Sequence, residues 1–102
     1  MPIQRSTCFK IKSDEDIPHM LEAYKTVEQD NERDGKRYIL SAKARQIISD
    51  PRNGGYNFIA LTTFASMDDV KFYDEQCEAH KKLKDFAKEK VGGPPLVLHF
   101  EI

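Results

Sequence analysis

The strongest constraint on the fold comes from residues 56–64, which alternate with the period of a β-strand and are apolar on both faces. One face holds Tyr56, Phe58, Ala60, Thr62 and Phe64, and the other holds Asn57, Ile59, Leu61 and Thr63. Because neither face suits contact with water, we expect the strand to be covered on both sides. Helices of the same chain can cover one side, and the second side must be covered by a different surface.

A helix is predicted directly after this strand. Ser66 and Asp69 form the Ser-x-x-Asp pattern of a capping box, in which each side chain binds a backbone amide of the first turn. Residues spaced by three or four then define one helical face, namely Val70, Tyr73, Cys77, His80, Leu83 and Ala87. This face exists only if the helix is continuous, because the polar segment 74–78 is able to hold a break.

Three more elements are predicted from periodicity and from the residues that begin and end them. Residues 3–12 alternate as a first strand, and Ser13 then begins a helix of about eighteen residues that ends near Gly35. The inner stripe of that helix holds Ile17, Met20, Leu21, Tyr24 and Val27. Residues 37–48 are predicted to form a second strand, with Tyr38, Leu40, Ala42, Ala44, Ile47 and Ile48 turned inward.

Turn residues connect these elements. Residues 49–55, SDPRNGG, favour a tight turn, so strands 37–48 and 56–64 are predicted to form an antiparallel hairpin. Gly92, Gly93, Pro94 and Pro95 end the second helical region, and residues 96–102 alternate as a last strand.

The order strand, helix, strand, strand, helix, strand predicts one α+β domain over residues 1–102 with a ferredoxin-like fold. Four antiparallel strands would carry both helices on one face. The helix-free face is predicted to hold Gln4, Ser6, Cys8, Asn57, Ile59, Leu61, Val97 and His99. This mixture suits contact with a second copy of the sheet, so we expect a homodimer in which the two sheets close into an α+β barrel.

Charge and composition exclude several partner classes. The chain of 102 residues has 16 Lys and Arg and 17 Asp and Glu, interspersed along its length, which argues against binding to nucleic acid or to a membrane surface. No stretch is apolar for long enough to span a bilayer, and the first residues lack an apolar leader. We therefore expect a cytoplasmic protein whose two cysteines, Cys8 and Cys77, are reduced.

The whole chain resembles the stress-responsive A/B barrel family, also called Dabb, of the dimeric α+β barrel group. The most specific signals are Gly55-Tyr56 at the strand opening, Phe64-x-Ser66, then Tyr73 and the Ala79-His80 pair. The resemblance implies a homodimer with a pocket between sheet and helices in each subunit, suited to a small, largely apolar or polyketide-like ligand. Family members include stress-induced plant proteins and a plant polyketide cyclase that closes a ring by intramolecular aldol condensation.

The resemblance also implies a catalytic pair. Tyr73 and His80 fall where the cyclase type has its tyrosine and catalytic histidine, with one extra residue between them here. An imidazole can remove an acidic α-hydrogen, and a phenol can donate to the carbonyl oxygen on which charge develops, so neither a metal nor an organic cofactor is required. Arg5 and Phe58 stand where the cyclase type has histidines, which changes the polarity of the pocket.

Structural roles for the same residues stay open. His80 suits a hydrogen-bonded structural histidine, Tyr73 suits core packing, and Cys77 with His80 has the spacing of a thiolate–imidazole or metal-ligand pair but lacks a third group. We predict that Arg5, Tyr24, Phe58 and Cys77 contact the ligand. A guanidinium beside Ile3 and Phe9 needs a partner, and the candidates are a substrate carboxylate, Glu101 and Asp85.

Three functions are consistent with the sequence: a ligand-binding dimer without catalysis, a cofactor-free cyclase or related lyase that uses His80 as base, and a structural protein whose purpose is dimerisation. An enclosed cavity into which the Tyr73 hydroxyl and a His80 nitrogen both point would favour the second, whereas a His80 tied to the backbone in a filled space would favour the third.

Overall fold

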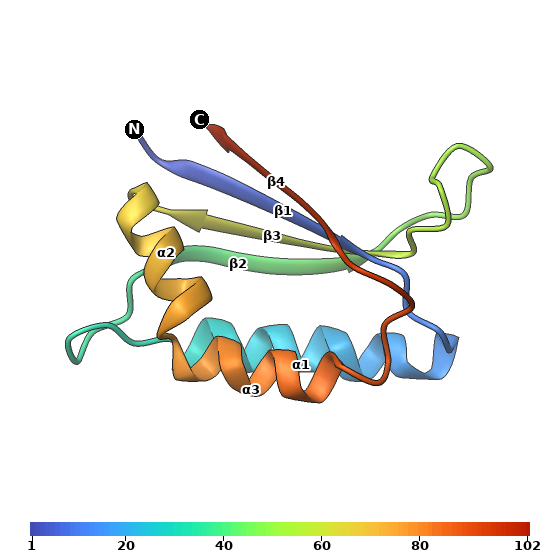
Figure 1. Ribbon diagram of the computed structural model, residues 1–102, viewed down its shortest axis with the longest axis horizontal. Coiled ribbons are helices and arrows are strands. Elements are labelled where there is room, and N and C mark those ends of the chain that lie inside the picture. Colours follow the sequence, from blue (N-terminus) through green and yellow to red (C-terminus); the bar gives the residue numbers. More distant parts are fainter.

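The computed structural model describes residues 1–102 and shows one antiparallel four-stranded sheet with helices on one face only (Figure 1). The elements are β1 (Ile3–Phe9), the 3-10 helix η1 (Asp14–Asp16), α1 (Ile17–Asp30), β2 (Ile39–Gln46), β3 (Phe58–Phe64), α2 (Met67–Glu75), α3 (Glu78–Ala87) and β4 (Leu96–Glu101). The strands lie in the order β2-β3-β1-β4. The predicted ferredoxin-like fold is confirmed, with the second helical region divided in two.

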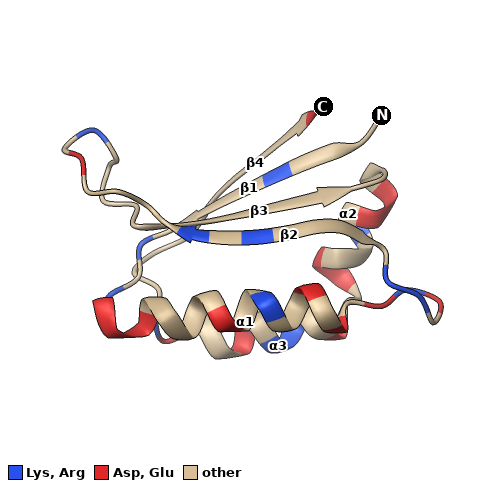
Figure 2. Ribbon diagram, turned by 180° about the vertical axis from the view of Figure 1, so that it is seen from behind, with Lys and Arg blue, Asp and Glu red and all other residues tan.

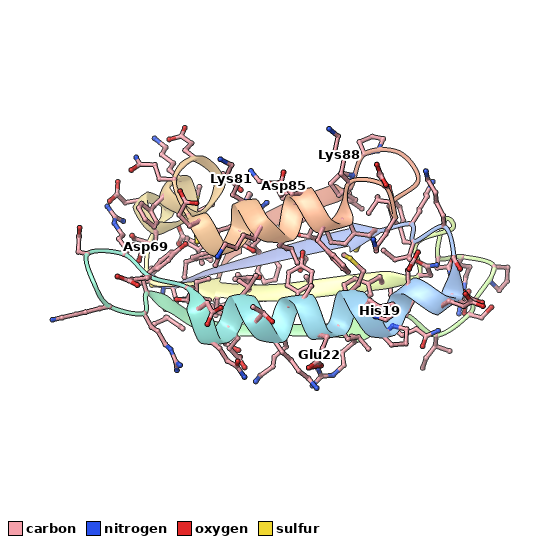
Figure 3. All side chains as sticks on the ribbon, turned by 90° about the horizontal axis from the view of Figure 1, so that it is seen from below. His19, Glu22, Asp69, Lys81, Asp85 and Lys88 are labelled. Atoms are coloured by element: carbon pink, nitrogen blue, oxygen red, sulfur yellow. The ribbon has the colours of Figure 1, made fainter.

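The core lies between the sheet and the helices. Alternate residues of the two central strands are buried on this side, namely Ile3, Arg5, Thr7 and Phe9 of β1 and Phe58, Ala60, Thr62 and Phe64 of β3. The helices α1 and α3 run side by side across the sheet and carry charged residues such as Glu22 and Asp85 away from it (Figure 3). None of the helices is long and apolar enough to cross a membrane.

The prediction that Val97 and His99 face away from the helices is wrong. In an antiparallel pair, directly opposed residues share a face, and Thr7 opposes Val97 while Arg5 opposes His99. Leu96, Leu98 and Phe100 oppose Cys8, Ser6 and Gln4, so β4 turns its three large apolar side chains to the helix-free face. They are 40%, 51% and 50% exposed. Figure 2 shows that charged residues are concentrated on the helices and loops and are few on the strands.

The second strand is shorter than predicted. It spans Ile39–Gln46, and the pairing with β3 shifts between Ile39 and Ser41, which takes Leu40 out of the alternation. Leu40 is 59% exposed, and Ile48, beyond the strand end, is 86% exposed, so both inward predictions are wrong. The antiparallel hairpin of β2 and β3 is confirmed.

The second helical region is broken within the polar segment 74–78, where the sequence left a break open. Ser66 caps α2 by accepting from the Asp69 amide at 3.4 Å, as predicted, whereas the Asp69 carboxylate binds Arg33 at 2.7 Å instead of reaching back. The helix ends at Glu75, and α3 starts at Glu78 with Cys77 in an extended conformation before it. The helices α2 and α3, on either side of this break, run in different directions (Figure 1).

A buried asparagine ends the first helix earlier than the sequence indicated. Asn31 is 2% exposed, and its Nδ2 donates to the carbonyls of Val27 and Glu28 at 3.0 and 2.7 Å. Its Oδ1 accepts from the amides of Tyr38 and Ile39 at 3.0 and 3.1 Å. One side chain thus satisfies the last carbonyls of α1 and aligns the start of β2, and α1 has 14 residues in place of about eighteen.

We expect Asn31→Ala to lower the free energy of unfolding by about 2 to 4 kcal/mol, because it leaves buried backbone groups without partners. Urea unfolding monitored by circular dichroism measures the change. Asn53→Ala is the matched control, since Asn53 makes one side-chain hydrogen bond in an exposed turn and its loss should cost under about 1 kcal/mol. Equal effects of the two substitutions would contradict this role of Asn31.

Candidate functional site

Four of the predicted site residues surround one cavity of about 130 Å³ between the sheet and the helices. Arg5 comes from β1, Tyr24 from α1, Tyr73 from the last turn of α2 and His80 from the first turn of α3. The cavity is also lined by Thr7, Phe9, Asp74, Leu83, Lys84, Ala87, Pro95 and Val97. Polar groups therefore converge on a hollow whose remaining wall is largely apolar.

The break between α2 and α3 fixes the orientation of His80. Because α2 stops at Glu75, the Tyr73 carbonyl lacks the helical donor that a continuous helix would supply, and His80 Nδ1 lies 2.8 Å from it. A carbonyl only accepts, so Nδ1 carries the proton and donates, and Nε2 keeps a free lone pair. The two rings are stacked, with centroids 3.7 Å apart and an angle of 9° between their planes.

His80 is neutral at neutral pH. Burial lowers its pKa to about 4, and the positive charges of Lys84 and Arg5 act in the same direction. The hydrogen bond to the Tyr73 carbonyl and the Asp74 carboxylate oppose this effect without cancelling it. His80 Nε2 is therefore an acceptor, and a weak base, throughout the physiological pH range.

Arg5 forms an ion pair that the sequence analysis did not identify. Its Nη1 donates to both carboxylate oxygens of Asp74, at 2.7 and 2.9 Å, and its Nε contacts Thr7 Oγ1 at 3.4 Å. The predicted protein partners, Glu101 and Asp85, are therefore wrong. Asp74 directly follows Tyr73 in the last turn of α2, and sequence periodicity carries no signal for its contact with a residue of β1.

The two tyrosines of the cavity are donors. Burial raises the pKa of Tyr24 and of Tyr73 above the usual phenol value, so both hydroxyls keep their protons. Tyr24 also packs against Phe9 and Phe58, with ring centroids 6.4 and 5.9 Å away. Arg5 lies 5.4 Å from the centroid of the Tyr73 ring, so this ring contacts both a guanidinium and an imidazole.

Phe58 and Cys77 lie outside the lining of the cavity. Phe58 is completely buried in the aromatic core, and Cys77, 3% exposed, lies at the break before α3. Both cysteines are free, and no group of three or more His, Cys, Asp or Glu is placed to hold a metal ion. Near Cys77, the Tyr38 hydroxyl is buried without a hydrogen-bond partner, although the thiol is close enough to help raise the tyrosine pKa.

The size of the cavity limits what it can hold. At about 130 Å³ it lies below the range of roughly 300 to 1,000 Å³ that is usual for drug-sized ligands. A larger hollow of about 510 Å³ lies between α1 and β2 and shares Tyr24 with it. The part of a ligand that reaches His80 is therefore small.

Comparison with known proteins identifies one related sequence and a common fold. No model of a protein family matches the chain. A fusaristatin A biosynthesis cluster protein of Gibberella zeae is 42% identical over 82 residues, which are 80% of this chain. The chain spans about three fifths of the length of that curated relative.

Solved structures share the fold at low sequence identity. A Dabb family protein with a ferredoxin-like fold from Mesorhizobium loti has 15% identity and a TM-score of 0.75, over 99% of this chain and 96% of its own. A hydroxynitrile lyase from Passiflora edulis has 13% identity and a TM-score of 0.78, over 99% and 93%. Other proteins of this fold are dimeric. The chain therefore shares its fold with a Dabb family protein.

Burial of a neutral His80 predicts how stability depends on pH. In the unfolded chain His80 binds a proton near its ordinary pKa of 6.5, whereas in the folded chain it does so only near 4. The free energy of unfolding is therefore not reduced by His80 above pH 6.5, and it decreases as the pH falls toward 4, because the unfolded chain binds the proton first. We expect wild type to lose about 3 kcal/mol more than His80→Gln over this interval, measured by urea unfolding. His19→Gln, at an exposed histidine, should leave the pH dependence of wild type unchanged.

Proposed function

We propose that the protein is a homodimer of secondary metabolism that binds a small carbonyl compound in the cavity between sheet and helices, without a cofactor. The observation that carries this proposal is that His80, whose Nδ1 is held by a backbone carbonyl, lines a hollow with apolar walls together with Tyr24 and Tyr73. Such a site can receive a carbonyl oxygen and hold the adjoining carbon near the imidazole.

The role in secondary metabolism is supported by the related sequence. The relative that is 42% identical is a protein of a fusaristatin A biosynthesis cluster. Identity at this level over 80% of the chain makes a related ligand class a reasonable expectation. The cavity itself accommodates only a small group, so a longer biosynthetic intermediate would place one end near His80 and extend outward.

The helix-free face supports dimerisation. The strand β4 exposes Leu96, Leu98 and Phe100 on this face, and β3 places the half-buried Ile59 and Leu61 on the same face on the other side of β1. A row of large apolar side chains along β4 is unfavourable in water and suits a second copy of the same surface. Dimerisation would leave the cavity side free to bind a ligand.

We expect wild type to have twice the 11.8 kDa mass of one chain and Leu98→Lys to have the mass of one. The substitution places a charge within the apolar contact, where it loses its hydration. Sedimentation velocity measures both masses. Ile48→Lys is the control, because this apolar residue lies in a loop and is 86% exposed, so its variant should stay dimeric. A monomeric wild type would contradict the proposed interface.

A lyase or cyclase activity is the second candidate, and the fixed tautomer of His80 favours it. Because Nδ1 is held by the Tyr73 carbonyl at 2.8 Å, Nε2 is available to take a proton from the carbon next to the bound carbonyl. The electron pair moves onto the carbonyl oxygen, where the Tyr73 hydroxyl donates a hydrogen bond. The resulting enolate carbon attacks a second carbonyl, and the imidazolium returns its proton to the alkoxide that forms.

The fold and the electrostatics set limits on this activity. A hydroxynitrile lyase is built on the same fold, so the fold accommodates lyase chemistry, although 13% identity carries no activity over. A base with a pKa of about 4 is weak, which restricts the substrate to compounds with strongly acidic α-hydrogens, such as 1,3-dicarbonyl compounds. Polyketide intermediates belong to this class.

The exchange of α-hydrogens tests the candidate activity directly. With methyl acetoacetate in deuterated buffer, wild type should accelerate loss of the methylene proton signal above the protein-free rate. His80→Gln should abolish the acceleration, and Tyr73→Phe should reduce it by about 10- to 100-fold, in line with the loss of one donor to the developing charge. His19→Gln is the matched control and should retain the wild-type rate. If wild type binds the ester but does not accelerate the exchange, the lyase activity is rejected and the ligand-binding function is retained.

A further inference from the structure

The guanidinium of Arg5 is buried in the cavity wall with part of its donor capacity unused. Arg5 is 7% exposed, and its Nη1 and Nε contact Asp74 and Thr7. Its Nη2 has no acceptor within the chain. This nitrogen is not sealed inside the protein either, because the Tyr38 hydroxyl is the single fully enclosed side-chain polar atom without a partner. The free N–H groups of Arg5 therefore have access to open space beside the cavity that Arg5 lines.

The charges around the cavity favour an anion. Asp74 compensates Arg5, and its side chain is 42% exposed at the rim. Lys84 adds a further positive charge, with its Nζ held at 3.3 Å from the Asp74 carbonyl. His80 is neutral, and Tyr24 and Tyr73 keep their protons. The lining thus has a net positive charge in a partly desolvated site, where electrostatic attraction is stronger than in water.

We infer that the ligand carries a carboxylate, which Arg5 Nη2 binds, so that the substrate class of the cavity is small 3-oxo acids and related carboxylate-bearing carbonyl compounds. This inference rests on the proposed function, in which the cavity binds a carbonyl compound. A guanidinium suits this role because its planar N–H groups match the geometry of a carboxylate.

The positions of Arg5 and His80 are compatible with one small ligand. The same oxygen, Asp74 Oδ1, lies 2.7 Å from Arg5 Nη1 and 4.0 Å from His80 Nδ1. The two cationic or basic groups are therefore only a few atoms apart. In a 3-oxo acid the acidic methylene lies between the carboxylate and the ketone. A carboxylate on Arg5 would keep this methylene and the ketone inside the cavity that His80, Tyr24 and Tyr73 line.

Binding of an acid would also change the basicity of His80. A carboxylate next to Arg5 offsets a positive charge that lowers the pKa of His80, and it adds a negative charge close to the imidazole. Both effects raise the pKa of His80 in the complex. The substrate acid would thus strengthen the base that acts on it, whereas a neutral ester would not.

The test compares acetoacetate with methyl acetoacetate, which has the same 3-oxo group but no charge. Affinities are measured at pH 7 by isothermal titration calorimetry with the intact wild-type chain, Arg5→Gln and Arg5→Lys. We expect wild type to prefer the acid by at least tenfold, Arg5→Gln to lose this preference, and Arg5→Lys to retain part of it. Arg45→Gln is the matched control, because Arg45 lies on β2 outside the cavity lining and its guanidinium binds a backbone carbonyl. Its preference should equal that of wild type.

A second variant distinguishes loss of the Arg5 contact from loss of the fold. Arg5→Gln leaves Asp74 without its partner, so the double variant Arg5→Gln with Asp74→Asn removes both charges, and circular dichroism verifies that each variant is folded. The inference is overturned if wild type binds the ester as tightly as the acid, or if the folded Arg5→Gln variant or the folded double variant keeps the full preference for the acid. Ester binding with accelerated exchange and no preference for the acid would overturn this inference alone. Failure of wild type to bind either compound would overturn the proposed function as well.

Discussion

The hydrogen bond between His80 Nδ1 and the Tyr73 carbonyl is the interaction on which the rest of the site depends. It exists because α2 ends at Glu75 and leaves that carbonyl without a helical donor. The same bond selects the tautomer of His80, stacks its ring on Tyr73 and presents Nε2 as an acceptor. A continuous helix would have placed both side chains on one face but would have satisfied the carbonyl internally. The break is therefore the local backbone feature that orients His80.

The size of the chain explains why the two faces of the sheet differ. A domain of 102 residues buries a limited area, and the core between sheet and helices uses most of its large apolar side chains. The register of β4 sends Leu98 and Phe100 to the opposite face, where no helix covers them. A second copy of the sheet can bury this surface without any additional element of the chain. The helix side is then free to keep a small cavity beside the core.

Electrostatics make this cavity different from an ordinary apolar hollow. Arg5 places a permanent positive charge on β1, and Asp74 compensates it from the last turn of α2. The desolvated guanidinium and Lys84 help to keep His80 uncharged. An anionic ligand would reverse part of this effect. The preference for an anionic ligand and the pKa of His80 thus depend on the same few side chains.

The sequence by itself determined the element order and the ferredoxin-like fold, because periodicity and turn residues are encoded locally, but it left open whether the helix that carries Tyr73 and His80 is continuous. Only the tertiary structure decided that β4 faces the other way, that Asp74 pairs with Arg5 and that Asn31 ends α1. These features depend on strand register and on contacts between residues far apart in the chain. Alternation shows that a strand has two faces, but only its neighbour decides which face meets the core.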